Sequence, residues 1–310
     1  MASPRRFQPG RILLALAALP RHVAKAFTFA GHGMGQSPQP KLRLQHSITD
    51  INGSTPPVSP VCVSPVQGDN ELVSFYLLRH GETNFNAIGR IQGTLDSSRL
   101  TDQGTSQAVE AGKNLASLPD LDLGSTVVVS PMRRAQQTLA CVRDELKLVG
   151  KDFSNVEIVP SIREIELFEW QGQLKDDLIK ERPDQYASWV KDPANFNLDG
   201  RYPARDLWAR AEKAWEEIRS LQSVQKQRKT LVVAHNAINQ ALLWTALGSD
   251  ASLFRKISWP NCAILELQWR QGEERAERYR WVLPGASEFV EAHDAEALCK
   301  GTQDDTRFTL

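Results

Sequence analysis

The sequence predicts an α/β fold with three layers, α-β-α, built on a mostly parallel β-sheet. Three apolar or β-branched runs are each followed by a polar turn and then by a helical pattern of apolar residues. Such recurring strand, turn and helix units are typical of a parallel sheet with helices on both faces. The predicted strands span residues 72–78, 126–129 and 230–234, and the helices that follow them span 101–118, 135–148 and 237–247.

Two further patterns complete the predicted fold. Residues 263–269 and 278–283 flank a polar turn, which predicts an antiparallel hairpin at the edge of the sheet. A polar insertion rich in Trp, Asp and Lys spans residues 164–205, and a helical pattern over 207–221 follows it. We expect this insertion to form a small cap over a substrate pocket.

The chain of 310 residues divides into four predicted regions. Residues 1–30 are predicted to be a targeting presequence, because arginines precede a short apolar run and a stretch of small residues. Residues 31–70 hold six of the seventeen prolines and are predicted to be a disordered linker. The folded domain is expected over residues 71–285, and residues 286–310 are predicted to be a polar tail.

The presequence and the composition bear on location and partners. The Ala26-Phe27 junction resembles the bipartite plastid presequences of algae, which predicts a chloroplast or plastid location, with a mitochondrial or secreted one as the alternative. The 37 basic and 37 acidic residues give no sign of a nucleic-acid partner. No apolar stretch reaches the ~18 to 20 residues that cross a bilayer, so the mature form is predicted to have no membrane partner. The four cysteines are scattered, which indicates neither a zinc site nor a disulfide framework.

Each predicted parallel strand ends in a cationic or imidazole side chain. Arg79 and His80 follow the first strand, Arg134 follows the second, and His235 follows the third. The carboxyl ends of parallel strands meet at one edge of a sheet, where ligands bind. Guanidinium groups and helix starts are good donors to phosphoryl oxygens. We therefore expect one shared phosphate site, with a small phosphorylated molecule as the partner.

His80 is the candidate nucleophile of this site. The sequence has no HExxH motif, no paired-Asp cluster and no GxxxxGK[ST] loop. Without a metal ion to activate water, attack by a side chain is the simplest route. Nearby guanidinium charge is expected to lower the pKa of His80, so that the neutral ring attacks. Neither a metal ion nor a cofactor is predicted.

Glu164 is the candidate general acid, with Glu82 and Glu166 as rivals. Glu164 follows the partly apolar run 156–162, which is another possible strand end. A leaving alkoxide needs a proton, and a carboxyl at the phosphate site could supply it. Further candidate phosphate-binding residues lie in the loop after the first strand and directly after His235; they are Asn86, Gln92, Gly93 and Asn236.

Four motifs occur in order between residues 72 and 240. They are Arg79-His80-Gly81-Glu82-Thr83 with Asn86, Ser130-Pro131-Met132-Arg133-Arg134-Ala135 with Thr138, Ile162-Arg163-Glu164-Ile165, and Val233-Ala234-His235. Together they resemble the motifs of the histidine phosphatase superfamily, in its phosphoglycerate mutase-like branch. The resemblance implies that His80 forms a phosphohistidine and that Glu164 protonates the leaving group. It also implies that Arg79, Arg134 and His235 hold the phosphate, that Asn86 contacts it, and that no metal ion is needed.

A narrower resemblance covers residues 192–210 and 234–243. These segments are similar to plant chloroplast proteins described as probable 2-carboxy-D-arabinitol-1-phosphatases, which remove phosphate from an inhibitor of Rubisco. Three features depart from the family pattern: Asn236 replaces a glycine, Phe168 stands where many relatives have glycine, and Tyr202-Pro203 lies near the place of a missing Gly-Glu-Ser element. These departures bear on the choice of substrate.

The predicted function is metal-independent hydrolysis of a phosphomonoester. The expected substrate is a small phosphorylated sugar or sugar acid, with 2-carboxy-D-arabinitol 1-phosphate as one candidate. A second anionic group of the substrate could be selected by Arg163, Lys175, Arg201 and Arg205, although each of these is individually more typical of a solvated surface charge. The alternatives are a phosphoglycerate mutase and a non-catalytic phospho-ligand-binding protein on the same fold.

Overall fold

The centre of the fold is a seven-stranded sheet. The computed structural model describes residues 71–282 and 288–294, and the predicted presequence and linker lie outside these residues. The strands are β1 (Leu72–Arg79), β2 (Thr126–Val129), β3 (Asn155–Ile158), β4 (Lys229–Ala234), β5 (Ile264–Arg270), β6 (Ala276–Val282) and β7 (Val290–Glu291). Their order is β3-β2-β4-β1-β5-β6-β7. The first four strands pair in parallel, and β5, β6 and β7 pair antiparallel.

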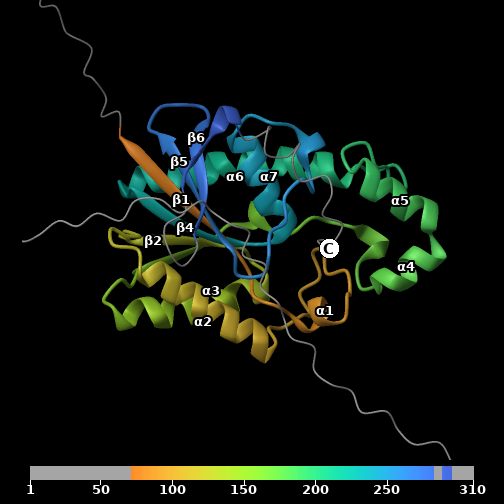
Figure 1. Cartoon of the computed structure of the whole chain (residues 1–310), viewed down its shortest axis with the longest axis horizontal. Coiled ribbons are helices and arrows are strands. Elements are labelled where there is room, and N and C mark those ends of the chain that lie inside the picture. The colour runs from red at the N-terminus through yellow and green to blue at the C-terminus, as the bar shows by residue number, and fades with distance from the viewer. Residues whose placement is uncertain (1–70, 283–287, 295–310) are drawn as a thin grey trace, which may run out of the picture. The chain divides into compact units, whose positions relative to one another are not determined.

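Helices cover both faces of this sheet (Figure 1). The α-helices are α1 (Asn84–Ala87), α2 (Asp102–Ala116), α3 (Arg133–Leu148), α4 (Lys175–Glu181), α5 (Pro183–Lys191), α6 (Pro203–Gln225) and α7 (Asn236–Ala246). Helices α2 and α3 lie on one face, and α6 and α7 lie on the other, which confirms the three-layer prediction. Within the described residues, no helix is both long and apolar enough to span a bilayer.

The alternation of side chains along β1 produces the two cores. Phe75 and Leu77 pack with the buried residues of α6 and α7, whereas Tyr76 and Leu78 pack with those of α2 and α3. Successive side chains of a strand point to opposite faces of a sheet, so a strand covered on both faces is apolar throughout. This is why β1 appears in the sequence as a continuous apolar run.

Most of the predicted elements are present, with bounds close to those expected. Strands β1, β2 and β4 and the β5–β6 hairpin are confirmed. Thr101 is the N-cap of α2, and its Oγ1 accepts a hydrogen bond from the Gly104 N–H at 2.9 Å. Helix α6 begins at Pro203, four residues before the predicted start at residue 207. Proline suits the first turn of a helix, because its fixed φ is helical and an N–H is not needed there.

Three predictions about local structure differ from the observed fold. The run 156–162 is not one strand: β3 ends at Ile158, and Pro160 begins a 3₁₀ turn (Pro160–Ile162) because proline cannot donate to the strand ladder. The segment expected to be a polar tail contributes β7, which pairs with β6. The antiparallel part of the sheet therefore has three strands instead of one hairpin.

The insertion over residues 164–205 forms the predicted cap with α4 and α5 (Figure 1). Its tryptophans hold it together: the Trp170 ring lies 6.4 Å from that of Trp189 and 5.1 Å from that of Phe196, measured between centroids. Trp189 also contacts Phe254, at 5.7 Å, in the loop that follows α7. Aromatic pairs at such distances add to the stabilisation from buried area. The cap is thereby fixed beside the carboxyl ends of the parallel strands.

The turn after β1 and the first turn of α2 are in close contact, and each has a glycine at the point of contact. A Cβ atom on Gly81 would lie 2.4 Å from the Gly104 carbonyl oxygen, and one on Gly104 would lie 1.9 Å from the Glu82 carbonyl oxygen. No side chain larger than hydrogen fits at either position without backbone displacement. This contact holds the backbone next to His80 in place.

Candidate active site

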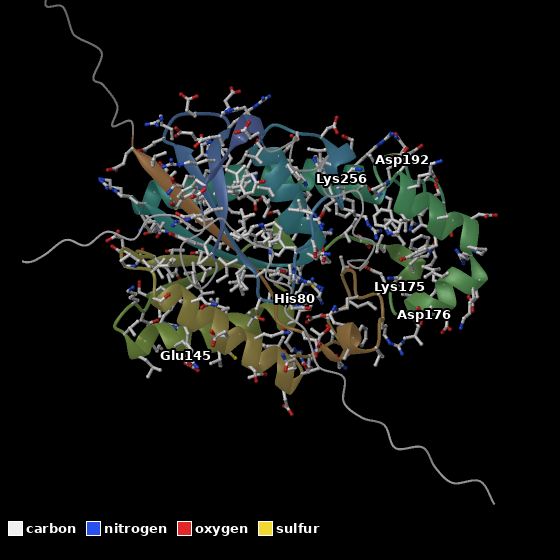
Figure 2. The ribbon with its side chains drawn as sticks, in the orientation of Figure 1. His80, Glu145, Lys175, Asp176, Asp192 and Lys256 are labelled. Atoms are coloured by element: carbon white, nitrogen blue, oxygen red, sulfur yellow. The ribbon has the colours of Figure 1, made fainter. Side chains whose placement is uncertain are left out.

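A pocket of about 530 Å³ opens where β1, β2 and β4 end. Eight of the nine predicted site residues line this pocket. They are Arg79, His80, Asn86, Gln92, Gly93, Arg134, Glu164 and Asn236. The ninth, His235, is fully buried beside His80, with 5.2 Å between the ring centroids. Figure 2 labels His80 at this edge of the sheet.

The geometry around His80 leaves one ring nitrogen available for attack. Its Nδ1 lies 2.7 Å from the Gly81 carbonyl oxygen, which can only accept a hydrogen bond, so Nδ1 carries the proton. In the neutral ring, Nε2 then has a free lone pair. Burial lowers the pKa of His80 well below its usual value, and the charges of Arg134 and Arg79 lower it further. The expected direction is confirmed, although burial is a larger cause than the guanidinium charge invoked from sequence.

Arg134 and His235 form a buried hydrogen-bonded pair behind the nucleophile. The Arg134 Nε donates to His235 Nδ1 at 3.2 Å, so the neutral His235 ring carries its proton on Nε2, 2.7 Å from the Ser130 Oγ. The terminal nitrogens of Arg134 donate to the carbonyl oxygens of Leu95 and Gly93, each at 2.8 Å. One N–H on each terminal nitrogen remains for a ligand.

Arg79 supplies a second guanidinium group from the end of β1. Its Nη1 donates to the Trp259 carbonyl oxygen at 2.5 Å. Its Nε is buried without a hydrogen-bond partner among the described residues. Burial lowers the pKa of Arg79 to about 10, and the nearby Glu164 charge opposes that shift. Arg79 is thus charged at neutral pH, and an anion in the pocket would satisfy its unpaired nitrogen.

The structure places Glu164, rather than either of its rivals, at the pocket. The Glu164 carboxylate accepts hydrogen bonds from the backbone N–H groups of Ala237 and Ile238 at 3.1 to 3.2 Å. Glu82 instead accepts from the Thr101 hydroxyl at 2.8 Å, and half-exposed Glu166 lies 4.0 Å from Arg163; neither lines the pocket. Glu164 follows a 3₁₀ turn, not a strand.

At two of the turns, some of the N–H groups at the start of the helix already have partners within the chain. In α7 the N–H groups of the second and third residues, Ala237 and Ile238, donate to Glu164. At the start of α3, the Arg133 N–H donates to the Asp96 carboxylate at 2.6 Å. Side chains with donors left for a phosphoryl group are those of Arg79, Arg134 and Asn86.

The remaining predicted residues have distinct surroundings. The Asn86 Oδ1 accepts from the Thr83 N–H and hydroxyl, so its amide nitrogen is the group left for a ligand. The Gln92 Oε1 accepts from Ser98 at 2.8 Å. Gly93 has φ +48°, and a Cβ there would lie 1.9 Å from the Gln171 side chain. The Asn236 Oδ1 accepts from the Gln240 amide at 3.0 Å.

Sequence reasoning missed several residues of the site. Arg210 donates to the Glu164 carbonyl oxygen at 2.9 Å, and Asn261 donates to the His80 carbonyl oxygen at 2.9 Å. Both fix the backbone of a predicted catalytic residue from a distant segment, so no local pattern marks them. Other missed residues line the pocket directly; they are Gln107, Tyr186, Trp189, Gln240, Arg255 and Trp259.

Of the four basic residues considered for a second anionic group, only Lys175 lines the pocket. Arg163 lies near Glu166 at the surface. Arg201 stacks on the Phe168 ring, 4.1 Å from its centroid, and Arg205 stacks on the Tyr202 ring at 4.4 Å. The alternative interpretation, a charge at the protein surface, therefore applies to three of the four: Arg163, Arg201 and Arg205.

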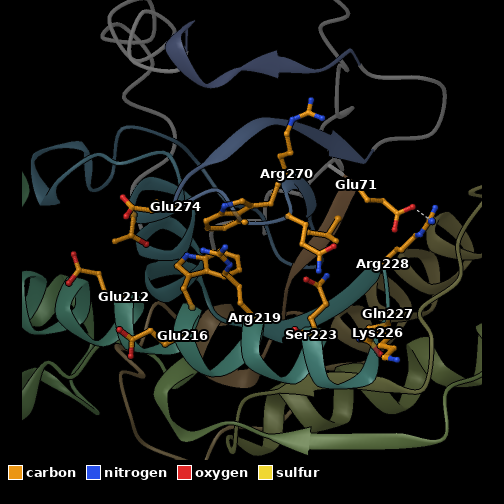
Figure 3. A pocket seen from close by; sticks show the side chains of 17 residues that line it. Glu71, Glu212, Glu216, Arg219, Ser223, Lys226, Gln227, Arg228, Arg270 and Glu274 are labelled. Atoms are coloured by element: carbon orange, nitrogen blue, oxygen red, sulfur yellow. Dashed lines mark ion pairs between the residues drawn. The ribbon is translucent and has the colours of Figure 1, made fainter. Parts of the chain in front are cut away.

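A second, larger hollow of about 870 Å³ lies where β1 and β4 begin (Figure 3). It is lined by charged side chains of both signs and by Trp215 and Trp269, and an ion pair between Glu71 and Arg228 closes one side of it. None of the predicted site residues lies there. The chemistry therefore favours the smaller pocket as the active site.

The two buried histidines predict how stability depends on pH. The pKa values of His80 and His235 are lowered in the folded state, in both cases mainly by burial. Below pH 6.5 the unfolded chain takes up protons that the folded chain does not. The free energy of unfolding should therefore be constant with respect to these groups above pH 6.5 and decrease below it, by up to about 1.4 kcal/mol per pH unit for each histidine.

Urea unfolding between pH 7.5 and 5.5 measures this slope. We expect His80→Gln to reduce it, whereas replacement of the exposed His293 by Gln controls for the loss of a histidine remote from the site. Equal slopes for the wild type and His80→Gln would contradict the buried, neutral state of His80.

Comparisons with known proteins agree with this geometry. The model of the histidine phosphatase superfamily, branch 1, matches residues 75–282. A "Probable 2-carboxy-D-arabinitol-1-phosphatase" of Arabidopsis thaliana is 38% identical over 193 residues, which are 62% of this chain and 37% of the relative. A 2-carboxy-D-arabinitol-1-phosphatase of Triticum aestivum is 35% identical over 222 residues, 71% of this chain and 40% of the relative. The matched part is thus less than half the length of either plant relative.

Two other similarities span nearly whole proteins. A probable phosphoglycerate mutase of Erwinia tasmaniensis is 28% identical over 225 residues, 72% of this chain and 96% of the relative. The solved structure of a mycobacterial glucosyl-3-phosphoglycerate phosphatase is 26% identical, with a TM-score of 0.55, and covers 69% of this chain and all of that one. With a family match over most of the described residues and the ordered side chains in one pocket, the chain belongs to branch 1 of the histidine phosphatase superfamily.

Proposed function

We propose that this protein is a metal-independent phosphomonoesterase that acts through a phosphohistidine on His80. The observation that carries the proposal is the state of the His80 ring. It is buried and neutral, its Nδ1 proton is directed at the Gly81 carbonyl oxygen, and its Nε2 lone pair is left for attack in a pocket that the guanidinium groups of Arg79 and Arg134 also line. A neutral nitrogen among fixed positive charges suits attack on an anionic phosphoryl group.

In the first step, the His80 Nε2 forms a bond to phosphorus while the bond between phosphorus and the ester oxygen breaks. Arg79, Arg134 and Asn86 donate hydrogen bonds to the other phosphoryl oxygens, with Arg79 using its unpaired Nε. Glu164, in its protonated form, transfers its proton to the leaving oxygen and becomes a carboxylate. The Ala237 and Ile238 N–H groups then stabilise that carboxylate.

In the second step, water attacks the phosphorus and the bond to Nε2 breaks. The Glu164 carboxylate accepts a proton from that water, which restores its starting state, and inorganic phosphate leaves. The roles of Glu164 in the two steps are the reverse of each other, as proton balance requires. His235 acts behind the nucleophile by holding the Arg134 guanidinium in place through its Nδ1.

The substrate class follows from the pocket and the relatives. A volume of about 530 Å³ fits a small molecule, and the lining mixes cationic and aromatic side chains. The plant relatives are named for 2-carboxy-D-arabinitol 1-phosphate, and the mycobacterial one for a glucosylated phosphoglycerate. We propose a phosphorylated sugar or sugar acid as the substrate of this chain, with 2-carboxy-D-arabinitol 1-phosphate as the first candidate.

The proposed location is a plastid. The proposal rests on the basic, apolar and small-residue pattern of residues 1–30 and on the Ala26-Phe27 junction. The test is the location of a fluorescent protein fused after residue 70 and expressed in an alga whose plastid lies behind ER-derived membranes. Accumulation in the plastid is expected, whereas accumulation in mitochondria or in the medium would contradict the proposal.

Replacement of Glu164 by Gln should slow only reactions whose leaving group needs a proton. For a sugar phosphate we expect kcat/KM to decrease by about 10²- to 10⁴-fold. For p-nitrophenyl phosphate, whose leaving group departs as an anion, we expect a decrease of less than about tenfold. The measurement is kcat/KM for both substrates with EDTA present. Glu166→Gln is the matched control, because Glu166 lies outside the pocket.

Equal losses on both substrates would contradict the role of Glu164 as general acid. Loss of wild-type activity in EDTA would contradict the metal-independent mechanism. Transfer between 2- and 3-phosphoglycerate in the same assay would identify a mutase instead. If the wild type turned over none of the phosphoesters but still bound them, the protein would be a phospho-ligand-binding protein.

A further inference from the structure

The charges that line the active-site pocket are unbalanced. Five cationic side chains line it, and Glu164 is the one carboxylate among its described lining residues. The five are Arg79, Arg90, Arg134, Lys175 and Arg255. Arg79 and Arg134 lie next to His80, where the proposed function places the reacting phosphoryl group. Arg90 donates to the Gly172 carbonyl oxygen and stacks on the Phe85 ring. Lys175 and Arg255 are not explained by the mechanism.

Arg255 is held in place through its backbone. It lies after the 3₁₀ turn Ala251–Leu253 and has φ +68°, a left-handed conformation that is unfavourable for a residue with a Cβ. Its N–H donates to the Gln240 Oε1 at 2.8 Å, and the Gln240 amide in turn donates to the Asn236 Oδ1 at 3.0 Å. The first turns of α7 therefore position the arginine, and strained backbone of this kind is concentrated at functional sites.

The guanidinium group of Arg255 is only partly satisfied. Its Nη1 is buried and has no hydrogen-bond partner among the described residues. Likewise, no Asp or Glu among the described residues forms an ion pair with Arg255. Its neighbours are Tyr186, whose side chain also lines the pocket, and the Trp189 ring, 5.6 Å from its Cζ. A partly buried cation whose buried nitrogen has no acidic partner is unfavourable unless a ligand supplies the negative charge.

Lys175 brings a second positive charge to the same part of the pocket. It is the first residue of α4 and lines the pocket together with Arg255. Burial lowers the pKa of Lys175, the Arg255 charge lowers it further, and Asp176 opposes the shift. The two cations are therefore near enough to repel each other. Figure 2 shows Lys175 and Asp176 on the cap helix, apart from His80.

We propose that Arg255 and Lys175 bind a second anionic group of the substrate, a carboxylate or a second phosphate, while the His80 end of the pocket binds the phosphoryl group that reacts. The proposal rests on the proposed function for the choice of the reacting end. It assigns substrate selection to one residue that sequence reasoning considered, Lys175, and to one that it missed, Arg255. Arg255 is thus the main specificity residue, and Gln240 is its positioning residue.

Binding to a protein that does not turn substrate over tests the proposal. The protein is the full chain with His80→Ala, and calorimetric titration gives Kd for matched ligand pairs. The carboxylate pairs are 3-phosphoglycerate with glycerol 3-phosphate, and 2-carboxyarabinitol 1-phosphate with arabinitol 1-phosphate. The phosphate pair is fructose 1,6-bisphosphate with fructose 6-phosphate. In at least one pair we expect the ligand with two anionic groups to bind tenfold tighter or more, and the pair that shows the preference distinguishes a carboxylate from a phosphate.

The variants Arg255→Gln and Lys175→Gln, each added to His80→Ala, should reduce that preference. For Arg255→Gln we expect the ratio of the two Kd values within a pair to decrease by about tenfold or more, and for Lys175→Gln by less. The Kd values of the ligands with one anionic group should change little. Lys256→Gln and Lys180→Gln are the matched controls, because both lysines are exposed and neither lines the pocket. Equal Kd values within every pair, or a preference that survives Arg255→Gln, would overturn the proposal.

Turnover of p-nitrophenyl phosphate separates this proposal from the proposed function. It is measured with His80 present, for the wild type and for Arg255→Gln. The thermal unfolding midpoint of Arg255→Gln, compared with that of the wild type, shows whether the variant is folded, and the exposed-residue controls Lys256→Gln and Lys180→Gln should retain the wild-type turnover. If the wild type were inactive while the binding preference and its loss in Arg255→Gln persisted, the proposed function would be wrong and the second anionic site would stand.

Discussion

The burial of a neutral His80 ring near the guanidinium groups of Arg79 and Arg134 is the constraint on which the rest of the site depends. Burial and like charge both disfavour the imidazolium form, so the ring enters the reaction with a free lone pair. The Gly81 carbonyl oxygen holds the proton on Nδ1, and this places the lone pair on Nε2. The close contact of Gly81 with Gly104 fixes that carbonyl group, and so the first turn of α2 contributes to the orientation of the proposed nucleophile.

The same constraint explains why the surrounding hydrogen bonds are so nearly complete. Arg134 is fully buried, and three of its N–H groups are used by His235, Leu95 and Gly93. A buried guanidinium group that lost these acceptors would be strongly destabilising. The two guanidinium nitrogens that are buried without a partner among the described residues, the Nε of Arg79 and the Nη1 of Arg255, both belong to residues that line the pocket. Unsatisfied cationic donors therefore occur where a ligand with two anionic groups is proposed to place its oxygens.

Much of the fold could be predicted because its central strands have simple patterns. Strands β1, β2 and β4 are covered on both faces and are therefore continuously apolar, and the turns after them carry the motif residues. Strand β3 could not be predicted correctly, since its side chains are largely exposed and the apolar run continues into a 3₁₀ turn. The helices α4 and α5 are short and charged, and the Trp170 cluster that holds them is formed only in the folded chain.

The part of the site that could not be predicted depends on contacts between distant segments. Arg255 has no local motif, and its position depends on Gln240 and on Trp189 in the cap. From the sequence, Phe168 and Asn236 can be recognised as residues that replace a glycine of the family pattern, but what they contact cannot be recognised. In the structure Phe168 has φ +45° and stacks with Arg201, while Asn236 accepts a hydrogen bond from the residue that holds Arg255. The residues of the proposed second anionic site therefore could not be found without the tertiary structure, whereas the proposed catalytic residues could be found from local motifs.

The most direct test of the central claim is to trap the phosphorylated enzyme. The full chain is mixed with a phosphomonoester, quenched in alkali within the first turnover, and digested for mass spectrometry. The account predicts one phosphoryl group on His80, formed as fast as the alcohol is released, and none in His80→Ala. Phosphate on another residue, or steady turnover with no phosphohistidine detected at any time, would contradict it.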